Sequence, residues 1–189
     1  MKLPLFTRDI NTATQQFVNG IDFNTPDDLV LLESILNQDH IRPLVDQGVK
    51  VGVDYHEDVG AIAFAHQTLD GDACVFFNSW QLRREREIIV NEEEFNHEIG
   101  QILAHECAHV KQMREGRLYV NSMVKVVFEG VEYVPSTDYN SMEYMYQPWE
   151  REANLAAIHY LMAQGVVDTE AEGWQMMENR MRGVVQEVA

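Results

Sequence analysis

The segment that most constrains this chain is His105-Glu106-Cys107-Ala108-His109, in which two histidines stand four residues apart. If the segment is helical, both imidazoles project from one face, one turn apart, and can reach a single tetrahedral metal ion. Glu106 then lies about 100° around the helix from His105, beside the pair, where its carboxylate can hydrogen-bond a metal-bound water without being a ligand. The pattern H-E-x-x-H therefore predicts a metal site with a general base.

The residues around the motif predict a buried helix. An apolar stripe runs through Ile99, Ile102, Leu103, Cys107, Val110 and Met113. Asn91, followed by three glutamates, is typical of a helix N-terminus, and Gly116 can end the helix. The alternative is a pair of surface histidines, because such a pentapeptide arises by chance in on the order of one chain in a hundred. The buried helix favours the metal site.

Length and charge limit the classes of function. With 189 residues, 46% of them hydrophobic, the chain can bury one substantial core, and we expect a single domain over residues 1–189. We find no signal-peptide pattern and no apolar run long enough to span a membrane. The net charge of −17 argues against binding a phosphate backbone. We therefore expect a soluble, cytoplasmic protein without membrane or nucleic-acid partners.

The two cysteines, Cys74 and Cys107, are expected to be reduced thiols, because a core of this size needs no disulfide. Cys107 lies about 200° around the helix from His105. Its thiol should therefore face the core and not the metal.

Periodicity outlines an α+β chain. We expect helices over about 8–19, 25–36, 91–116, 147–165 and 169–184, and strands over about 49–55, 60–66, 73–78, 123–128 and 131–134. The last two strands flank Glu129-Gly130 and are predicted to form a hairpin. The basic run 83–86 is interpreted as a solvated turn, and residues 139–146 as a tyrosine-rich loop. The methionines of the last helix are expected to fill the core.

A catalytic zinc ion usually takes three protein ligands, so a third ligand must lie outside the pentapeptide. The candidates are Glu150, Glu152 and five histidines, His40, His56, His66, His97 and His159. Glu150 and Asn154 lie one turn apart on one helix face, with the small residues Ala153 and Ala157 beside them, which lets that helix approach the metal helix. Glu152 points about 200° away from Glu150. This geometry favours Glu150, with the histidines as alternatives.

At this point the sequence resembles the gluzincin clan of metallopeptidases, in which H-E-x-x-H on one helix is followed by a glutamate ligand on a second helix. More narrowly, H-E-C-A-H-V-K-Q at 105–112, F-E-G-V-E-Y at 128–133 and Q-P-W-E-R-E-A at 147–153 are similar to small phage-encoded zinc peptidases that carry H-E-x-x-H-V-x-Q and P-W-E-x-E-A. The resemblance covers residues of about 73 to 160. It implies that His105, His109 and Glu150 are ligands of Zn²⁺.

The resemblance also implies a fold and a reaction. The fold would be a single-domain zincin-like α+β fold, with a small, mostly antiparallel sheet packed on the motif helix. The reaction would be endopeptidase cleavage of a protein or peptide substrate, in which Glu106 takes a proton from zinc-bound water. The strand 73–78 would border the cleft, where an extended peptide could pair with it. Asn154, where the clan favours Asp, would bond the metal-free nitrogen of His105 or His109.

Two questions stay open at the level of sequence. One is a second function, a phage virion or assembly protein that keeps the fold and acts through contacts with virion or host proteins; Glu106 favours the enzyme, because a structural metal site needs no base. The other is the oxyanion donor. Tyr139, Tyr144, Tyr146 and Arg151 lie near Glu150 in sequence, but loop tyrosines more often pack as lids, so we leave these residues outside the predicted site.

Overall fold

The computed structural model describes residues 5–7, 26–45, 48–54, 60–67, 72–122, 125–136, 138 and 141–183. The helix expected over 8–19, the candidate ligand His56 and Tyr139 lie outside these ranges. Within them, no helix has the length and apolar character needed to cross a membrane. The described elements form an α+β arrangement.

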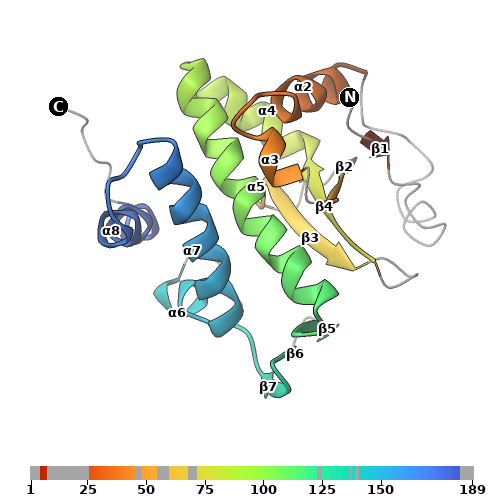
Figure 1. Cartoon of the computed structure of the whole chain (residues 1–189), viewed down its shortest axis with the longest axis vertical. Coiled ribbons are helices and arrows are strands. Elements are labelled where there is room, and N and C mark those ends of the chain that lie inside the picture. Colours follow the sequence, from red (N-terminus) through yellow and green to blue (C-terminus); the bar gives the residue numbers. More distant parts are fainter. Residues whose placement is uncertain are drawn as a thin grey trace.

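The centre of the fold is the motif helix α5 (Glu92–Arg114), 23 residues long. Its N-terminus is capped as predicted, because the side chain of Asn91 accepts a hydrogen bond of 3.1 Å from the backbone N–H of Glu94. Gly116 follows its end with a φ of 69°, a conformation that glycine adopts without strain. In Figure 1, α5 runs between the larger sheet on one side and helix α7 (Pro148–Ala163) on the other.

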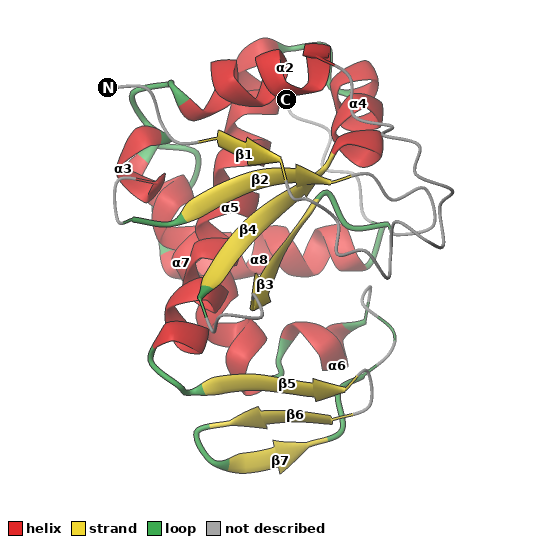
Figure 2. Cartoon of the chain, turned by 90° about the vertical axis from the view of Figure 1, so that its right-hand side faces the viewer, coloured by secondary structure: helices red, strands yellow, loops and turns green. Residues whose placement is uncertain are grey.

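The larger sheet contains β1 (Leu5–Thr7), β2 (Lys50–Asp54), β3 (Ala63–Gln67) and β4 (Ala73–Asn78), in the order β1-β2-β4-β3 (Figure 2). We predicted a mostly antiparallel sheet, but here this expectation is wrong. Strands β1, β2 and β4 are parallel, and only β3 runs antiparallel, at the edge beside β4. Part of the difference comes from β1, which we did not predict. The chain between β1 and β2 contains α2 (Pro26–Leu36) and α3 (Arg42–Val45), and these helices supply the crossover connection that two parallel strands require.

Strand β4 is buried along its whole length, as expected for an interior strand between two neighbours. It continues into α4 (Ser79–Ile88), where Asn78 caps the helix by accepting a bond of 3.2 Å from the backbone N–H of Trp80. The basic run 83–86 therefore lies within a helix, and our interpretation of it as a turn is wrong. The main core joins the inner face of this sheet to α2 and to one side of α5, through residues such as Leu32, Val75 and Leu103.

A smaller antiparallel sheet follows α5. It consists of β5 (Leu118–Ser122), β6 (Lys125–Phe128) and β7 (Val131–Tyr133). The predicted hairpin is confirmed: both turn residues have positive φ, 51° at Glu129 and 80° at Gly130, as a two-residue turn of type I′ requires. Strand β5 was not predicted. The sheet buries Leu118, Val126 and Phe128 against Trp149, and so anchors the start of α7.

Helix α7 lies close along α5. It follows the short helix α6 (Met142–Met145) and precedes α8 (Glu170–Met181), whose cap is the predicted Thr169. The small side chains on its inner face, Ala153 and Ala157, are fully or almost fully buried. On α5, Gly100 leaves room for the ring of Tyr160: a Cβ at this position would lie 1.9 Å from the tyrosine hydroxyl and 2.2 Å from the carbon that bears it. The absence of a side chain at Gly100 therefore sets how closely the helices approach.

We predict that Gly100→Ala lowers the free energy of unfolding by about 1–3 kcal/mol, because the buried ring of Tyr160 must move to make room. Chemical denaturation of the variant and the wild type measures the difference. Gly60→Ala is the matched control, since a Cβ there meets no atom of the described residues within 4 Å. Equal stability of Gly100→Ala and the wild type would show that this close approach does not hold.

Candidate metal site

Three side chains from two helices converge on one point. His105 Nε2 and His109 Nε2 lie 3.1 Å apart, and Glu150 Oε2 lies 3.2 Å from the first and 3.4 Å from the second. Ligand atoms about 2.0–2.1 Å from a tetrahedral metal ion are separated from one another by about 3.3–3.4 Å. The three atoms fit that spacing. His105, His109 and Glu150 could therefore hold a metal ion, and they are the one such group in the described part of the chain.

The electrostatics of the group favour a cation. Burial disfavours the charge of Glu150, yet the two histidines outweigh it and hold the pKa of this carboxyl far below its usual range. Burial likewise disfavours a charged His109, but its hydrogen bonds with Glu150 and Gln112 and the negative charges of Glu150 and Glu106 raise the pKa of the imidazole to about 9. Because Glu150 is only 4% exposed, water does little to screen its charge. The negative charge of Glu150 would be balanced either by a proton on one of the histidines or by a metal ion bound between the three side chains.

The rotation of α7 selects Glu150 over its neighbour. Glu150 lies in the first turn, directly after Pro148 and the buried Trp149. Glu152 points elsewhere, as predicted, and pairs with Arg117, whose Nη1 donates to Glu152 Oε1 over 3.0 Å. The helical period therefore predicted correctly that Glu150, and not Glu152, faces the two histidines.

The other candidate ligands lie in different surroundings. His159 is half exposed and pairs with Glu170 over 2.8 Å. His97 and His40 lie near each other, with ring centroids 6.1 Å apart. His66 packs its ring against Phe76 on the next strand. None of these four joins the group formed by His105, His109 and Glu150.

Gln112 connects the two ligand helices, a role that the sequence analysis missed. Its side chain is fully buried, and its amide oxygen lies 2.9 Å from His109 Nδ1. Its amide nitrogen donates to the backbone oxygen of Trp149, the residue before Glu150, over 3.1 Å. The first bond places the proton of a neutral His109 on Nδ1 and leaves Nε2 free for a metal, while the second fixes the start of α7. The sequence did contain a signal for this role, because Gln112 is the final glutamine of the pattern H-E-x-x-H-V-x-Q that we noted at 105–112.

Asn154 does not make the contact that we predicted. Its amide nitrogen donates to the backbone oxygen of Met145 over 3.1 Å, and the metal-free nitrogen of His109 is bonded by Gln112 instead. The residue still faces the site, since it lines the same pocket as His105. The difference arises from α6, which the sequence did not predict and which brings the Met145 carbonyl within reach.

Tyr144 is a second residue whose role the sequence did not assign. Its hydroxyl donates to Glu150 Oε1 over 2.8 Å. The other carboxylate oxygen, Oε2, is the one that faces the two histidines. This division favours binding of a metal through a single oxygen of Glu150. The nearby Tyr146 lies farther out, stacked on Trp174 of α8.

Glu106 lies where helix α5 meets the edge strand. One of its oxygens accepts a bond of 2.6 Å from the backbone N–H of Ala65 in β3. Burial raises the pKa of Glu106 above its usual value, and the charge of Glu150 adds to this, although both histidines and the Ala65 bond oppose it. The strand beside the site is thus β3. Our expectation that the strand 73–78 borders the cleft is wrong, because β4 lies inside the sheet.

A pocket of about 380 Å³ opens at this point. It is lined by His105 and Glu106 together with residues of the β3 edge, α7 and α8. Its α8 wall includes Met177 and Met181, which we expected only to fill the core. Cys107 lies elsewhere: its thiol contacts the backbone oxygen of Leu44 at 3.8 Å, and both Cys74 and Cys107 are free thiols, as predicted.

Comparison with known proteins gives no match to a family model, a curated protein or a solved structure. The resemblance to gluzincins therefore stays a prediction.

We predict that Glu150→Gln abolishes tight metal binding, because an amide oxygen supplies no negative charge to offset a divalent cation in a buried site. Metal content after dialysis, measured by atomic emission, checks this. Glu152→Gln is the matched control and should retain the metal, since its partner is Arg117. Loss of metal in the control but not in Glu150→Gln would show that the third ligand is misassigned.

The role of Gln112 predicts different results for two substitutions. Gln112→Leu removes both bonds and should weaken metal binding by about 10- to 100-fold. Gln112→Glu keeps an oxygen for His109 but cannot donate to Trp149 as a carboxylate, so it should lower stability more than metal affinity. Competition with a chelator dye measures affinity, and thermal unfolding measures stability. Unchanged affinity in Gln112→Leu would contradict the role.

Proposed function

We propose that this protein is a zinc-dependent endopeptidase that hydrolyses peptide bonds with Glu106 as the general base. The observation that carries the proposal is the convergence of His105, His109 and Glu150 on one point, beside a pocket that His105 lines together with Glu106, a carboxylate that is not part of the metal group. A site built only to hold a structural metal ion would have no use for this fourth residue.

The set of donor atoms supports zinc over other metals. Two imidazole nitrogens and one carboxylate oxygen are a common catalytic zinc set, whereas magnesium and calcium prefer oxygen alone. His105, His109 and Glu150 would hold the ion and leave one position open. When bound, zinc supplies a Lewis acid that polarises a carbonyl group and lowers the pKa of a water molecule.

The chain supplies the base. Glu106 has a pKa above its usual value because it is buried, which makes its carboxylate a better proton acceptor near neutral pH. The N–H of Ala65 fixes one carboxylate oxygen. The other oxygen is then available to take a proton from the attacking water and pass it to the leaving amine.

The edge strand β3 supports a peptide as substrate. Ile62 O accepts from Asn78 N over 2.7 Å, so by the alternation of an antiparallel ladder the backbone groups of Ala63, Ala65 and Gln67 point away from β4. The N–H of Ala65 is already bonded to Glu106, so an extended chain could pair with this edge only through the other outward groups, those of Ala63 and Gln67 and the carbonyl of Ala65. Cleavage within an extended segment suits an endopeptidase.

We expect Glu106→Gln to retain zinc and to lose activity by a factor of roughly 10²–10⁴, because the amide cannot accept the proton. Zinc content and cleavage of a mixed peptide library, with and without a chelator, test the two parts separately. If the zinc-loaded wild type cleaves no peptide of a broad library, the peptidase proposal fails, and the alternative of a virion or assembly protein that acts through contacts takes its place.

A further inference from the structure

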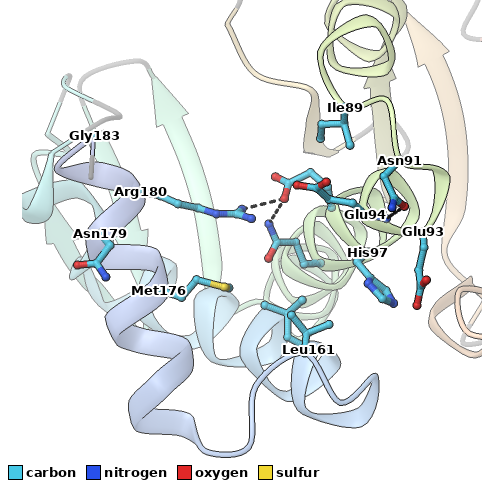
Figure 3. Close-up of a pocket in the computed structure, with 13 residues that line it drawn as sticks. Ile89, Asn91, Glu93, Glu94, His97, Leu161, Met176, Asn179, Arg180 and Gly183 are labelled. Atoms are coloured by element: carbon cyan, nitrogen blue, oxygen red, sulfur yellow. Dashed lines mark hydrogen bonds and ion pairs between the residues drawn. The ribbon is translucent and has the colours of Figure 1, made fainter. Parts of the chain in front are cut away.

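A second pocket lies next to the one that contains His105 and Glu106. It has a volume of about 670 Å³ and lies between the first turns of α5, the end of α7 and one face of α8 (Figure 3). Gln101 and Arg180 line both pockets. The two pockets are therefore neighbours along α5.

The charges of the second pocket are unbalanced. Glu93, Glu94 and Glu98 line it, against the single guanidinium of Arg180. Figure 3 shows Arg180 extending from α8 toward α5, where it pairs with Glu98 over 2.8 Å. Within the described ranges, Glu93 and Glu94 have no ion pair.

Acidic residues in a first helical turn are common, because they complement the helix dipole, so these glutamates alone do not define a site. Gln101 supplies an independent observation. The residue is only 6% exposed, and its amide nitrogen donates to Glu98 Oε2 over 2.7 Å. Its amide oxygen is buried and has no hydrogen-bond partner among the residues that the structure describes. A buried acceptor without a donor costs free energy, which a ligand with an N–H group would recover.

We propose that this pocket binds the cationic side chain of a lysine or arginine in the peptide substrate. The inference rests on the proposed function, since it assigns this pocket to a substrate that is cleaved in the neighbouring pocket, beside His105 and Glu106. Glu93 and Glu94 supply negative charge, and Gln101 supplies the unpaired acceptor. The apolar residues Leu161 and Met176 provide a surface for the aliphatic stem of a long basic side chain.

The helix geometry sets the distance between the basic residue and the scissile bond. Glu94 precedes His105 by 11 residues of α5, which is about 16 Å along the axis. The extended side chain of a lysine or arginine covers about 6 Å of this distance and leaves about 10 Å for the peptide backbone. An extended peptide covers about 3.3 Å per residue. The basic residue should therefore lie about three residues from the bond that is cleaved.

Binding can be tested without turnover in the Glu106→Gln protein loaded with zinc. The probes are acetylated, amidated alanine peptides with one central leucine and, three residues before or after it, lysine, arginine or the uncharged norleucine. Titration calorimetry should give at least about five-fold tighter binding for a basic peptide than for its norleucine counterpart. Adding Glu93→Gln and Glu94→Gln should reduce this ratio to about one. Glu92→Gln, a glutamate of the same turn that does not line the pocket, is the matched control and should preserve the ratio.

Gln101→Leu removes the unpaired acceptor without changing the charge, and should also reduce the preference for basic peptides. Equal binding of basic and norleucine peptides to the Glu106→Gln protein would overturn the inference, as would an equal loss of the ratio in the Glu92→Gln control. Cleavage by the wild type separates this inference from the proposed function. A protein that cleaves peptides without preferring a basic residue refutes only the pocket, whereas one that binds basic peptides and cleaves none refutes only the peptidase.

Discussion

The close packing of α7 against α5 is the contact on which the site depends. Helix α5 contributes two candidate ligands and α7 contributes one. The separation of the helices therefore decides whether the three atoms can share one metal ion. Small residues make the approach close: Ala153 and Ala157 on one helix, and Gly100 on the other. Gln112 then fixes the relative position of the ends that matter, by bonding the ligand His109 and the backbone next to the ligand Glu150. Packing brings the helices together, and this buried amide holds the ligands in register.

The parts of the site that follow from local geometry could be predicted from the sequence. The spacing of His105 and His109, the cap at Asn91 and the choice of Glu150 over Glu152 need only the period of a helix and the chemistry of its ends. The turn at Glu129-Gly130 is equally local. Such features depend on residues a few positions apart, which is why a single sequence suffices for them.

The remaining parts depend on contacts between segments that are distant in sequence. The hydrogen bond from Ala65 to Glu106 joins residues 41 positions apart, and the bond from Gln112 to Trp149 joins residues 37 positions apart. No local sequence pattern predicts either bond. One of the two parallel pairings of the larger sheet involves β1, a strand of three residues with too little sequence to be recognised, and the other joins β2 to β4 across the sheet. The error at Asn154 has the same origin. Asn154 lines the same pocket as His105, but its amide nitrogen donates to a carbonyl of α6 and not to a histidine.

In the function that we propose, chemistry and selectivity would come from different parts of this chain. The candidate ligands and the proposed base, Glu106, lie within residues 105–150, inside the stretch in which we noted a resemblance to gluzincins. Helix α8 lies outside that stretch, yet Met177, Met181 and Arg180 form one wall of the pocket that His105 and Glu106 line. This helix is held in place by specific contacts, among them Gly173 against Ile158 and the pairing of Arg180 with Glu98. A helix fixed in this way would be able to vary the side chains that face the pocket without moving the candidate metal ligands, because none of the three lies on it. The proposed reaction and the choice of substrate would then be free to change independently.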